Sequence, residues 1–107
     1  MKLTVSKESL AGELKKVLNA VNAKTTIPVL NNVLLEADEN GLTIAATDLE
    51  VYLRSTVDAV TEQSGKTTLP ARKFGQIVSA LPDGDVRLET NEDEQTSISC
   101  NNSFFRL

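Results

Sequence analysis

The 107 residues are enough for one small domain, and 40% apolar with 24% charged residues is the composition of a folded globular protein. One cysteine and no histidine exclude an internal disulfide and zinc sites built from these two residue types, and they favour a reducing cytoplasm. Four aromatic residues, none of them tryptophan, argue against base stacking as a mode of nucleic-acid binding. No apolar run approaches the roughly 20 residues of a membrane span, so we expect neither export nor membrane insertion.

The net charge of −4 is arranged in alternating segments. Residues 1–30 carry five lysines and two acids, and residues 63–82 carry three basic residues and no acid. Residues 31–62 carry seven acids and one arginine, and residues 83–107 carry six acids and two arginines. Positive charge is therefore concentrated in two separate stretches of the chain.

The first half predicts a strand, a helix and three strands. Leu3 and Val5 alternate with polar residues, and Ser6 is a suitable N-cap for a helix that starts at Lys7. The apolar face of this helix is Leu10, Leu14, Val17, Leu18 and Val21, and its other faces carry Lys15, Lys16, Asn19 and Asn22. Three strands follow at 33–37, 42–47 and 50–57, with a turn at Asn40 and Gly41.

The second half predicts the same order. A short strand at 67–69 leads to Pro70, which suits a helix start, and the helix runs over about 71–81 until Pro82. Its buried stripe is Phe74, Ile77, Val78 and Leu81, and its polar remainder is Arg72, Lys73, Gln76 and Ser79. After a turn at 83–85, strands are expected at 86–89, at 96–100 and from Phe104 onward, with a turn at 91–94.

We interpret this order as a duplication, with repeats at about 1–62 and 63–107. An offset of 64 aligns the strand and helix (Val5 with Leu69, Leu10 with Phe74). The first copy has additional residues after its helix, at Lys24 to Asn32, that the second copy lacks. An offset of 54 aligns the hairpins through Leu34 with Leu88, Ile44 with Ile98, Ala46 with Cys100, Val51 with Phe105 and Leu53 with Leu107. A chance match of short apolar patterns is the alternative. The alignment gives Val57 a counterpart near position 111, so we expect a truncated last strand with an exposed edge, in a piece of a longer protein.

The expected fold class is α+β, with two helices packed side by side on antiparallel sheet and their polar faces pointing the same way. Lys15, Lys16, Arg72 and Lys73 would then present positive charge to DNA phosphates without reading sequence. The alternative is that they are ordinary solvated residues of a helix surface.

Other candidate sites have weaker support. Asp83, Asp85 and residues 92–94 have turn composition, so we expect turns there and no metal site. Asp48 and Glu50 share a strand face but have no catalytic partner, and Cys100 has no histidine to activate it. No glycine falls in a phosphate-binding motif. We therefore expect no cofactor and no enzymatic activity.

Four segments together resemble the first domain of the bacterial sliding clamp, the beta subunit of the replicative DNA polymerase. They are MKLTVSKESL (1–10), TTIPVLNNVLLEA (25–37), LTIAATDLEVYL (42–53) and TTLPARKF (67–74). The resemblance covers the whole chain, which we expect to be a first clamp domain, 1–107, incomplete at its C-terminal end. It implies a processivity factor of DNA replication, a head-to-tail homodimeric ring of three-domain chains whose helices line the hole around duplex DNA.

The resemblance also implies roles for particular residues. Lys24 and Arg72 match DNA-contacting positions, and Lys73, Ile77 and Phe105 match positions of the dimer interface. Asn102 and Phe104 depart from the basic residues that some relatives carry near this strand.

In the full-length protein the implied partners are duplex DNA, a second clamp subunit, the polymerase and the clamp loader. The second and third domains, with the peptide-binding pocket of the family, have no counterpart in this chain, so we expect it neither to bind those peptides nor to close a ring alone. The main alternative is a non-enzymatic interaction module that accepts a partner strand at residues 104–107.

Overall fold

The computed structural model describes residues 1–20, 32–47 and 51–107. Within them lie two helices, α1 (Lys7–Ala20) and α2 (Ala71–Ala80). The strands are β1 (Lys2–Ser6), β2 (Asn32–Asp38), β3 (Gly41–Thr47), β4 (Tyr52–Val57), β5 (Val60–Gln63), β6 (Gly65–Pro70), β7 (Asp85–Thr90), β8 (Thr96–Cys100) and β9 (Ser103–Arg106). The expected α+β class is confirmed.

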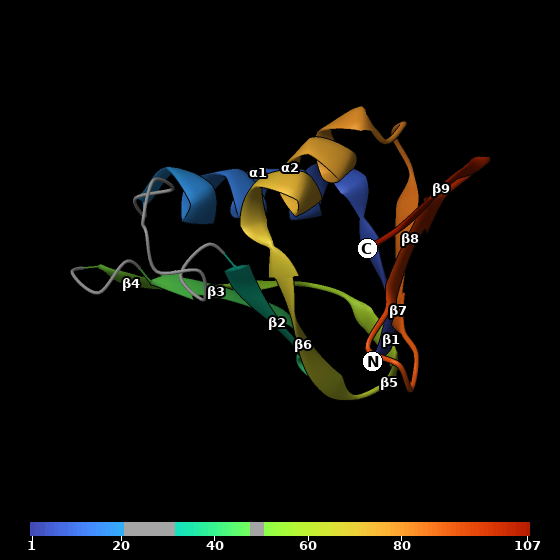
Figure 1. Cartoon of the computed structure of the whole chain (residues 1–107), viewed down its shortest axis with the longest axis horizontal. Helices are drawn as coiled ribbons and strands as arrows, with labels where there is room; N and C mark the ends of the chain where they lie inside the picture. Colours follow the sequence, from blue (N-terminus) through green and yellow to red (C-terminus); the bar gives the residue numbers. More distant parts are fainter. Residues whose placement is uncertain (21–31, 48–50) are drawn as a thin grey trace.

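The strands form two antiparallel sheets rather than one continuous sheet. The five-stranded sheet has the order β5-β1-β7-β8-β9, and the four-stranded sheet has the order β4-β3-β2-β6. Figure 1 shows both helices side by side on the same side of the four-stranded sheet, with the five-stranded sheet standing at one end. The helices therefore keep one face free of both sheets, as the sequence predicted.

The two copies of the β-α-β-β-β unit exchange their first strands. β1 pairs with β7 of the second copy, and β6 pairs with β2 of the first copy. Each sheet thus combines the hairpins of one copy with the opening strand of the other.

Strand β5 was not predicted. Its sequence, Val60–Gln63, has little alternation, and Val60 is 71% exposed. Pairing with β1 holds it in the sheet, and Glu62 accepts two hydrogen bonds from Arg87 on β7, at 2.9 and 3.4 Å. Long-range contacts rather than local preference define this strand.

One predicted alignment of the repeats is wrong by one residue. Leu88 pairs with Ile98, and its counterpart in the first copy is Leu35, which pairs with Ile44. Leu35 and Leu88 are fully buried, whereas Leu34, the predicted match, is 38% exposed. Two adjacent leucines fit either register in sequence, and a one-residue shift exchanges the two faces of a strand.

The alignment of the third strands is also wrong. Ser55 pairs with Ile44 as Phe105 pairs with Ile98, so Phe105 corresponds to Ser55 and not to Val51. The reason is turn length, since the pair Thr47 and Tyr52 encloses four residues, whereas the equivalent positions 101 and 102 are adjacent.

In this register Leu107 corresponds to Val57 rather than to Leu53. Val57 pairs with Leu42, and Leu107 exchanges backbone hydrogen bonds of 3.0 and 2.8 Å with Thr96, the counterpart of Leu42. The counterpart that the sequence alignment gave Val57 near position 111 rested on the misaligned third strands. β9 does lie at a sheet edge, as expected.

Apolar residues of both helices and both sheets share one core. Ser6 caps α1 as predicted, because its hydroxyl oxygen accepts the backbone N–H of Ser9 at 3.2 Å. The most deeply buried helix residues are Leu10, Leu14, Val17, Phe74 and Val78, and Leu81 is buried directly after α2. Leu18 and Ile77, predicted for the same stripes, are partly buried at its margin, and Val21 lies outside the described residues.

Gly75 allows α1 and α2 to approach closely. A Cβ atom at this position would lie 2.8 Å from Cδ1 of Leu18, whereas a Cβ atom at Gly12, also in a helix, would meet nothing within 4 Å. Helix propensity alone favours alanine over glycine at both positions.

We expect Gly12→Ala to raise the free energy of unfolding by about 0.5–1 kcal/mol, because the helix gains propensity at no steric cost. Gly75→Ala should gain less or lose stability, because Leu18 must move. Urea denaturation measures both variants. Equal gains at the two positions would contradict close helix packing at Gly75.

Candidate nucleic-acid interface

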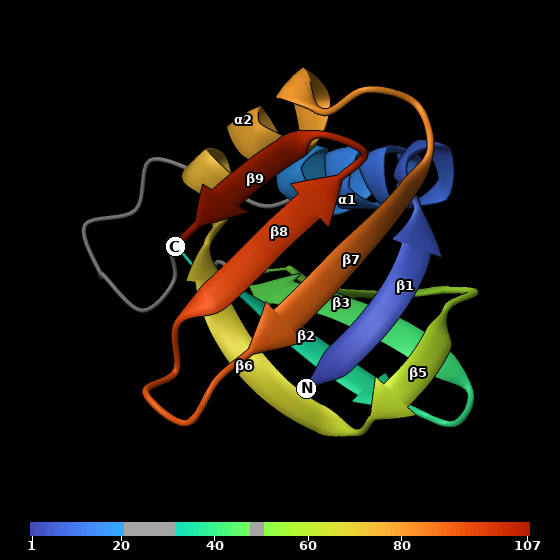
Figure 2. The same ribbon diagram turned by 90° about the vertical axis from the view of Figure 1, so that its right-hand side faces the viewer.

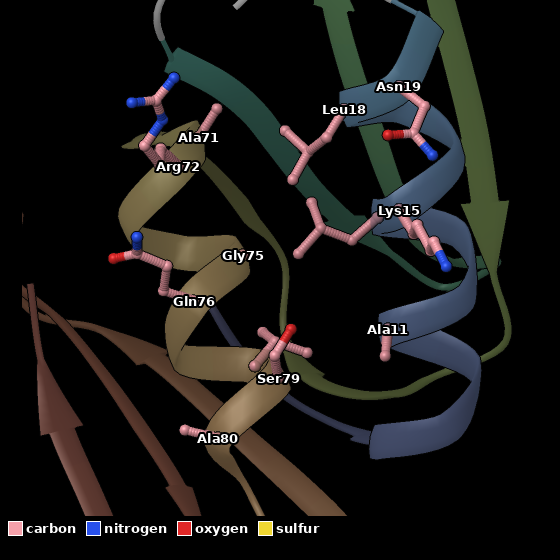
Figure 3. A pocket seen from close by; sticks show the side chains of 12 residues that line it. Ala11, Lys15, Leu18, Asn19, Ala71, Arg72, Gly75, Gln76, Ser79 and Ala80 are labelled. Atoms are coloured by element: carbon pink, nitrogen blue, oxygen red, sulfur yellow. The ribbon is translucent and has the colours of Figure 1, made fainter.

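A groove runs between α1 and α2 on the side of the helices that faces away from the four-stranded sheet (Figure 3). Its volume is about 780 Å³. We call it the helix groove, and its lining residues are Ala11, Leu14, Lys15, Leu18, Asn19, Ala71, Arg72, Gly75, Gln76, Val78, Ser79 and Ala80.

Lys15 and Arg72 both line the helix groove, one from each helix. Figure 3 shows Lys15 on α1 and Arg72 on α2, with Leu18 between the helices. Both cationic side chains are exposed. The expectation that the two helices present their polar faces on one side of the molecule is confirmed for this pair.

The helices run in opposite directions along the groove. Asn19 lies at the same end as Arg72, and Ala11 lies at the same end as Ala80 (Figure 3). The later half of α1 therefore flanks the beginning of α2, which brings Lys15 and the first turn of α2 to one part of the surface.

The two helix N-termini differ in how their free N–H groups are satisfied. α1 begins with the Ser6 cap and has Glu8 in its first turn, which complements the positive end of the helix dipole. α2 begins after Pro70 with no side-chain cap and no acid, and carries Arg72 and Lys73 in its first turn.

Cations at a helix N-terminus oppose the helix dipole, at a cost of about 0.3–1 kcal/mol each. The start of α2 is therefore not arranged for the stability of the helix itself. A helix N-terminus with no side-chain cap and with cationic side chains in its first turn is instead suited to an anion such as phosphate.

Lys16 lies beside α1's own carboxylate Glu13, with Nζ 3.1 Å from Oε1. Glu13 also accepts a hydrogen bond from the Ser55 hydroxyl on β4. This bond first, and then Lys16, hold the pKa of Glu13 below its ordinary value of 4.5. The ammonium group remains accessible, since the Lys16 side chain is 71% exposed and a surface ion pair contributes at most about 1 kcal/mol.

The remaining predicted interface residues are only partly placed. Lys24 lies outside the described residues. Lys73 is exposed on α2, and Ile77 on α2 and Phe105 on β9 pack against the margin of the core. Their role in subunit contact stays a prediction.

The acidic segment at 92–94 forms a turn, as expected, whereas Asp85 is the first residue of β7. The Asn91 side-chain oxygen accepts the N–H groups of Asp93 and Gln95 at 2.9 and 3.0 Å, which closes the turn around residues 92–94. Residues 1–20, 32–47 and 51–107 contain no group of three or more potential metal ligands. Asp48 and Glu50 fall outside these ranges.

Cys100 is buried, and its thiol lies 3.4 Å from the Pro82 carbonyl oxygen, to which it donates. This is the structural thiol that the sequence predicted. Neither described helix is long and apolar enough to cross a membrane.

Sequence reasoning missed the contacts that place the helix surface. A glycine within an otherwise helical pattern can signal close packing, so Gly75 carried a usable signal. The Glu13–Ser55 contact had no such signal in the sequence, because the two residues are 42 positions apart and their proximity follows from the packing of α1 on β4.

The family model for the N-terminal domain of the DNA polymerase III beta subunit matches residues 1–107. The chain belongs to this family. Curated relatives named beta sliding clamp include proteins of Chlamydia muridarum, 38% identical over 107 residues, and Synechocystis, 45% identical over 95 residues. These matches cover 100% and 87% of the chain, but 29% and 24% of the two relatives.

Solved structures of the family have the same fold. The DNA polymerase sliding clamp from Caulobacter crescentus is 36% identical, with a TM-score of 0.92. The match covers 99% of this chain and 29% of that one. The expected resemblance to sliding clamps is confirmed, for a chain that spans less than a third of the length of these relatives.

We expect Ser55→Ala to raise the pKa of Glu13 toward 4.5, because it removes the largest cause of the lowering. Lys16→Gln should raise it by less, and Ser79→Ala on α2 is the control. NMR titration of the Glu13 side-chain carboxyl measures the pKa.

The free energy of unfolding of the wild type should depend on the ionisation of Glu13. Because the folded state lowers the pKa of Glu13, the ionised carboxylate stabilises the fold above its unfolded pKa, and this contribution disappears as pH falls through the folded pKa. The stability difference between wild type and Glu13→Gln should therefore narrow between pH 7 and about pH 3. A difference that does not change with pH would contradict the contact.

Proposed function

We propose that the chain is the first domain of a sliding clamp, a processivity factor that encircles duplex DNA and tethers the replicative polymerase. This proposal rests on the observation that Lys15 and Arg72 line one groove on the helical side of a domain of this family. In a ring with its helices inward, the helix groove would face the DNA backbone.

The binding that such a surface supports is weak and independent of sequence. Lys15, Lys16 and Arg72 meet phosphates as point charges or short hydrogen-bonding forks, which carry no information about base sequence. Weak contacts of this kind centre a duplex and let it slide, while closure of the ring retains it. Lys24 belongs to the same proposal on the strength of the family resemblance.

The charge of the outer sheet surface supports this orientation. Two cations of the five-stranded sheet are paired with acids, since Lys2 lies 3.4 Å from Glu89 and Arg87 lies 2.9 Å from Glu62. Arg72 and Lys73, by contrast, begin α2 with no acid in the same turn. The helical side is therefore the better surface for a polyanion.

Lys73, Ile77 and Phe105 form the proposed contact with a second clamp subunit. Ile77 and Phe105 are apolar residues left partly exposed at the core margin, which is the composition of an interface centre. The complementary surface, like the sites for polymerase and clamp-loader peptides, would belong to the two thirds of a clamp that this chain does not match.

The proposed role is non-catalytic and cytoplasmic, as expected for an accessory subunit of a bacterial DNA polymerase. Among the described residues, the buried thiol of Cys100 has no activating base and no carboxylate cluster is formed. The reaction would belong to the polymerase that the clamp holds.

The chain alone should bind a short duplex weakly, at or beyond the weak end of about 10⁻⁴ to 10⁻⁶ M at physiological salt, because its net charge is −4. Arg72→Ala and Lys15→Ala should each weaken binding to unrelated sequences equally, and each should reduce the slope of log K against log salt by about 1. Fluorescence anisotropy at several salt concentrations measures both.

Lys66→Ala is the matched control, because Lys66 is an exposed cation on β6, on the side of the strand opposite the buried Leu69. Equal losses from Lys66→Ala and Arg72→Ala would contradict a DNA surface on the helices. Tight binding of a short duplex that resists salt would contradict retention by encirclement.

The rival function, an interaction module that accepts a strand, is favoured by one observation. β9 ends the five-stranded sheet, so one of its edges is open among the described residues. A partner protein that binds at β9, with an affinity that does not depend on Lys15 or Arg72, would support the interaction module instead.

A further inference from the structure

Glu13 is an acidic residue on a helix whose next charged side chains are cationic. It is followed along α1 by Lys15 and Lys16. Its Oε1 atom lies 3.1 Å from Nζ of Lys16, and its Oε2 atom accepts a hydrogen bond from the Ser55 hydroxyl. Both carboxylate oxygens are therefore engaged, one by the helix itself and the other by strand β4.

Ser55 fixes the Glu13 carboxylate from the side of the sheet. α1 packs on β3 and β4, and both ribbon views show the helix on one side of the four-stranded sheet (Figures 1 and 2). Ser55 belongs to the face of β4 that is turned inward, since Leu53 and Val57 on the same face pack in or against the core. The Glu13 side chain is only 29% exposed, so the carboxylate is anchored between the helix and the sheet.

Lys15 and Lys16 are adjacent in sequence but differ in their surroundings. Lys15 lines the helix groove, and no ion pair involves it within residues 1–20, 32–47 and 51–107. The Lys16 side chain is 71% exposed but lies beside the Glu13 carboxylate. The charge of Lys16 is therefore compensated locally, whereas that of Lys15 is not.

We propose that Glu13 is a positioning residue that weakens the contact of Lys16 with DNA phosphate, so that α1 holds the duplex mainly through Lys15. This inference rests on the proposed clamp function and adds to its DNA surface an acidic residue that limits how tightly the surface binds. Loose backbone contacts suit a clamp that retains DNA by encirclement, because each phosphate contact must be broken before the duplex can move.

Glu13 opposes phosphate binding in either arrangement of Lys16. When Lys16 stays beside Glu13, the phosphate meets a pair with no net charge. When Lys16 turns to the phosphate, the carboxylate remains on Ser55, so two anions then lie near one ammonium group and repel each other. The direction of the effect therefore does not depend on the side-chain conformation of Lys16.

The Glu13 carboxylate carries a full negative charge near neutral pH. The hydrogen bond from Ser55 first, and then Lys16, lower the pKa of Glu13 from its ordinary value of 4.5. Its removal by substitution is therefore a change of one unit charge on the DNA-facing helix.

Binding of a short DNA duplex to the 107-residue chain tests the proposal, with fluorescence anisotropy at several salt concentrations as the readout. Glu13→Gln keeps the shape of the side chain and its ability to accept the Ser55 hydrogen bond, but it removes the charge. The affinity should rise about three- to eightfold at 0.1 M salt, and the slope of log K against log salt should steepen by about 0.5–0.9, because Lys16 gains a phosphate contact. Circular dichroism establishes that each variant is folded.

Glu8→Gln is the matched control, because it removes the same charge from the same helix. Glu8 is exposed in the first turn of α1 and precedes Lys16 by eight residues, which is about 12 Å along the helix axis. This separation exceeds the Debye length of about 10 Å at 0.1 M salt, so the affinity should change by less than about twofold. Equal gains from Glu8→Gln and Glu13→Gln would overturn the proposal, because net charge alone would then explain them.

A double-variant cycle connects the effect to Lys16. In a Lys16→Gln background, Glu13→Gln should change the affinity by less than about twofold, because no ammonium group remains to be released. A gain of the same size with and without Lys16 would show that Glu13 acts through another group, and the proposal would be wrong.

Arg72→Ala separates this inference from the proposed function. Weaker binding of Arg72→Ala, together with an affinity and salt slope that Glu13→Gln leaves unchanged, would keep the DNA surface and refute the role of Glu13. Binding that does not depend on Arg72 would refute the DNA surface on the helices and this inference with it.

Discussion

The exchange of opening strands between the two repeats is the constraint on which the remaining structure depends. β1 is hydrogen-bonded to β7, and β6 to β2, so neither repeat completes a sheet from its own residues. Each helix follows directly from an exchanged strand, α1 from β1 and α2 from β6. The exchange therefore brings the two helices together in one layer, and it creates the groove that Lys15 and Arg72 line.

Local signals in the sequence were sufficient for the helices. Ser6, the spacing of Leu10, Leu14 and Val17, and the prolines at 70 and 82 act within a few residues, so their effect can be read without knowledge of the fold. The charges of Lys15 and Arg72 could be assigned to exposed faces for the same reason. That both would line one groove also required the expectation that the helices pack side by side.

Features that depend on residues distant in the sequence were harder to predict. The choice between Leu34 and Leu35 as the buried residue is made by the pairing of β2 with β3 and β6, and β5 is a strand because β1 and Arg87 hold it. The third strands were misaligned because turn length, not residue type, sets their register. Family resemblance supplied the functional assignment of Lys24 and Phe105, which composition and periodicity alone did not.

The position of β1 has a consequence for how the domain is made. This first strand lies between β5 and β7, whose residues are synthesised about 60 and 80 positions later, and Met1 accepts a backbone hydrogen bond from Thr90 at 2.9 Å. Contacts so remote along the chain close large loops and slow folding. During synthesis on the ribosome, β1 lacks both neighbouring strands until most of the domain has emerged, which leaves its apolar residues accessible to chaperones or to other nascent chains during that interval.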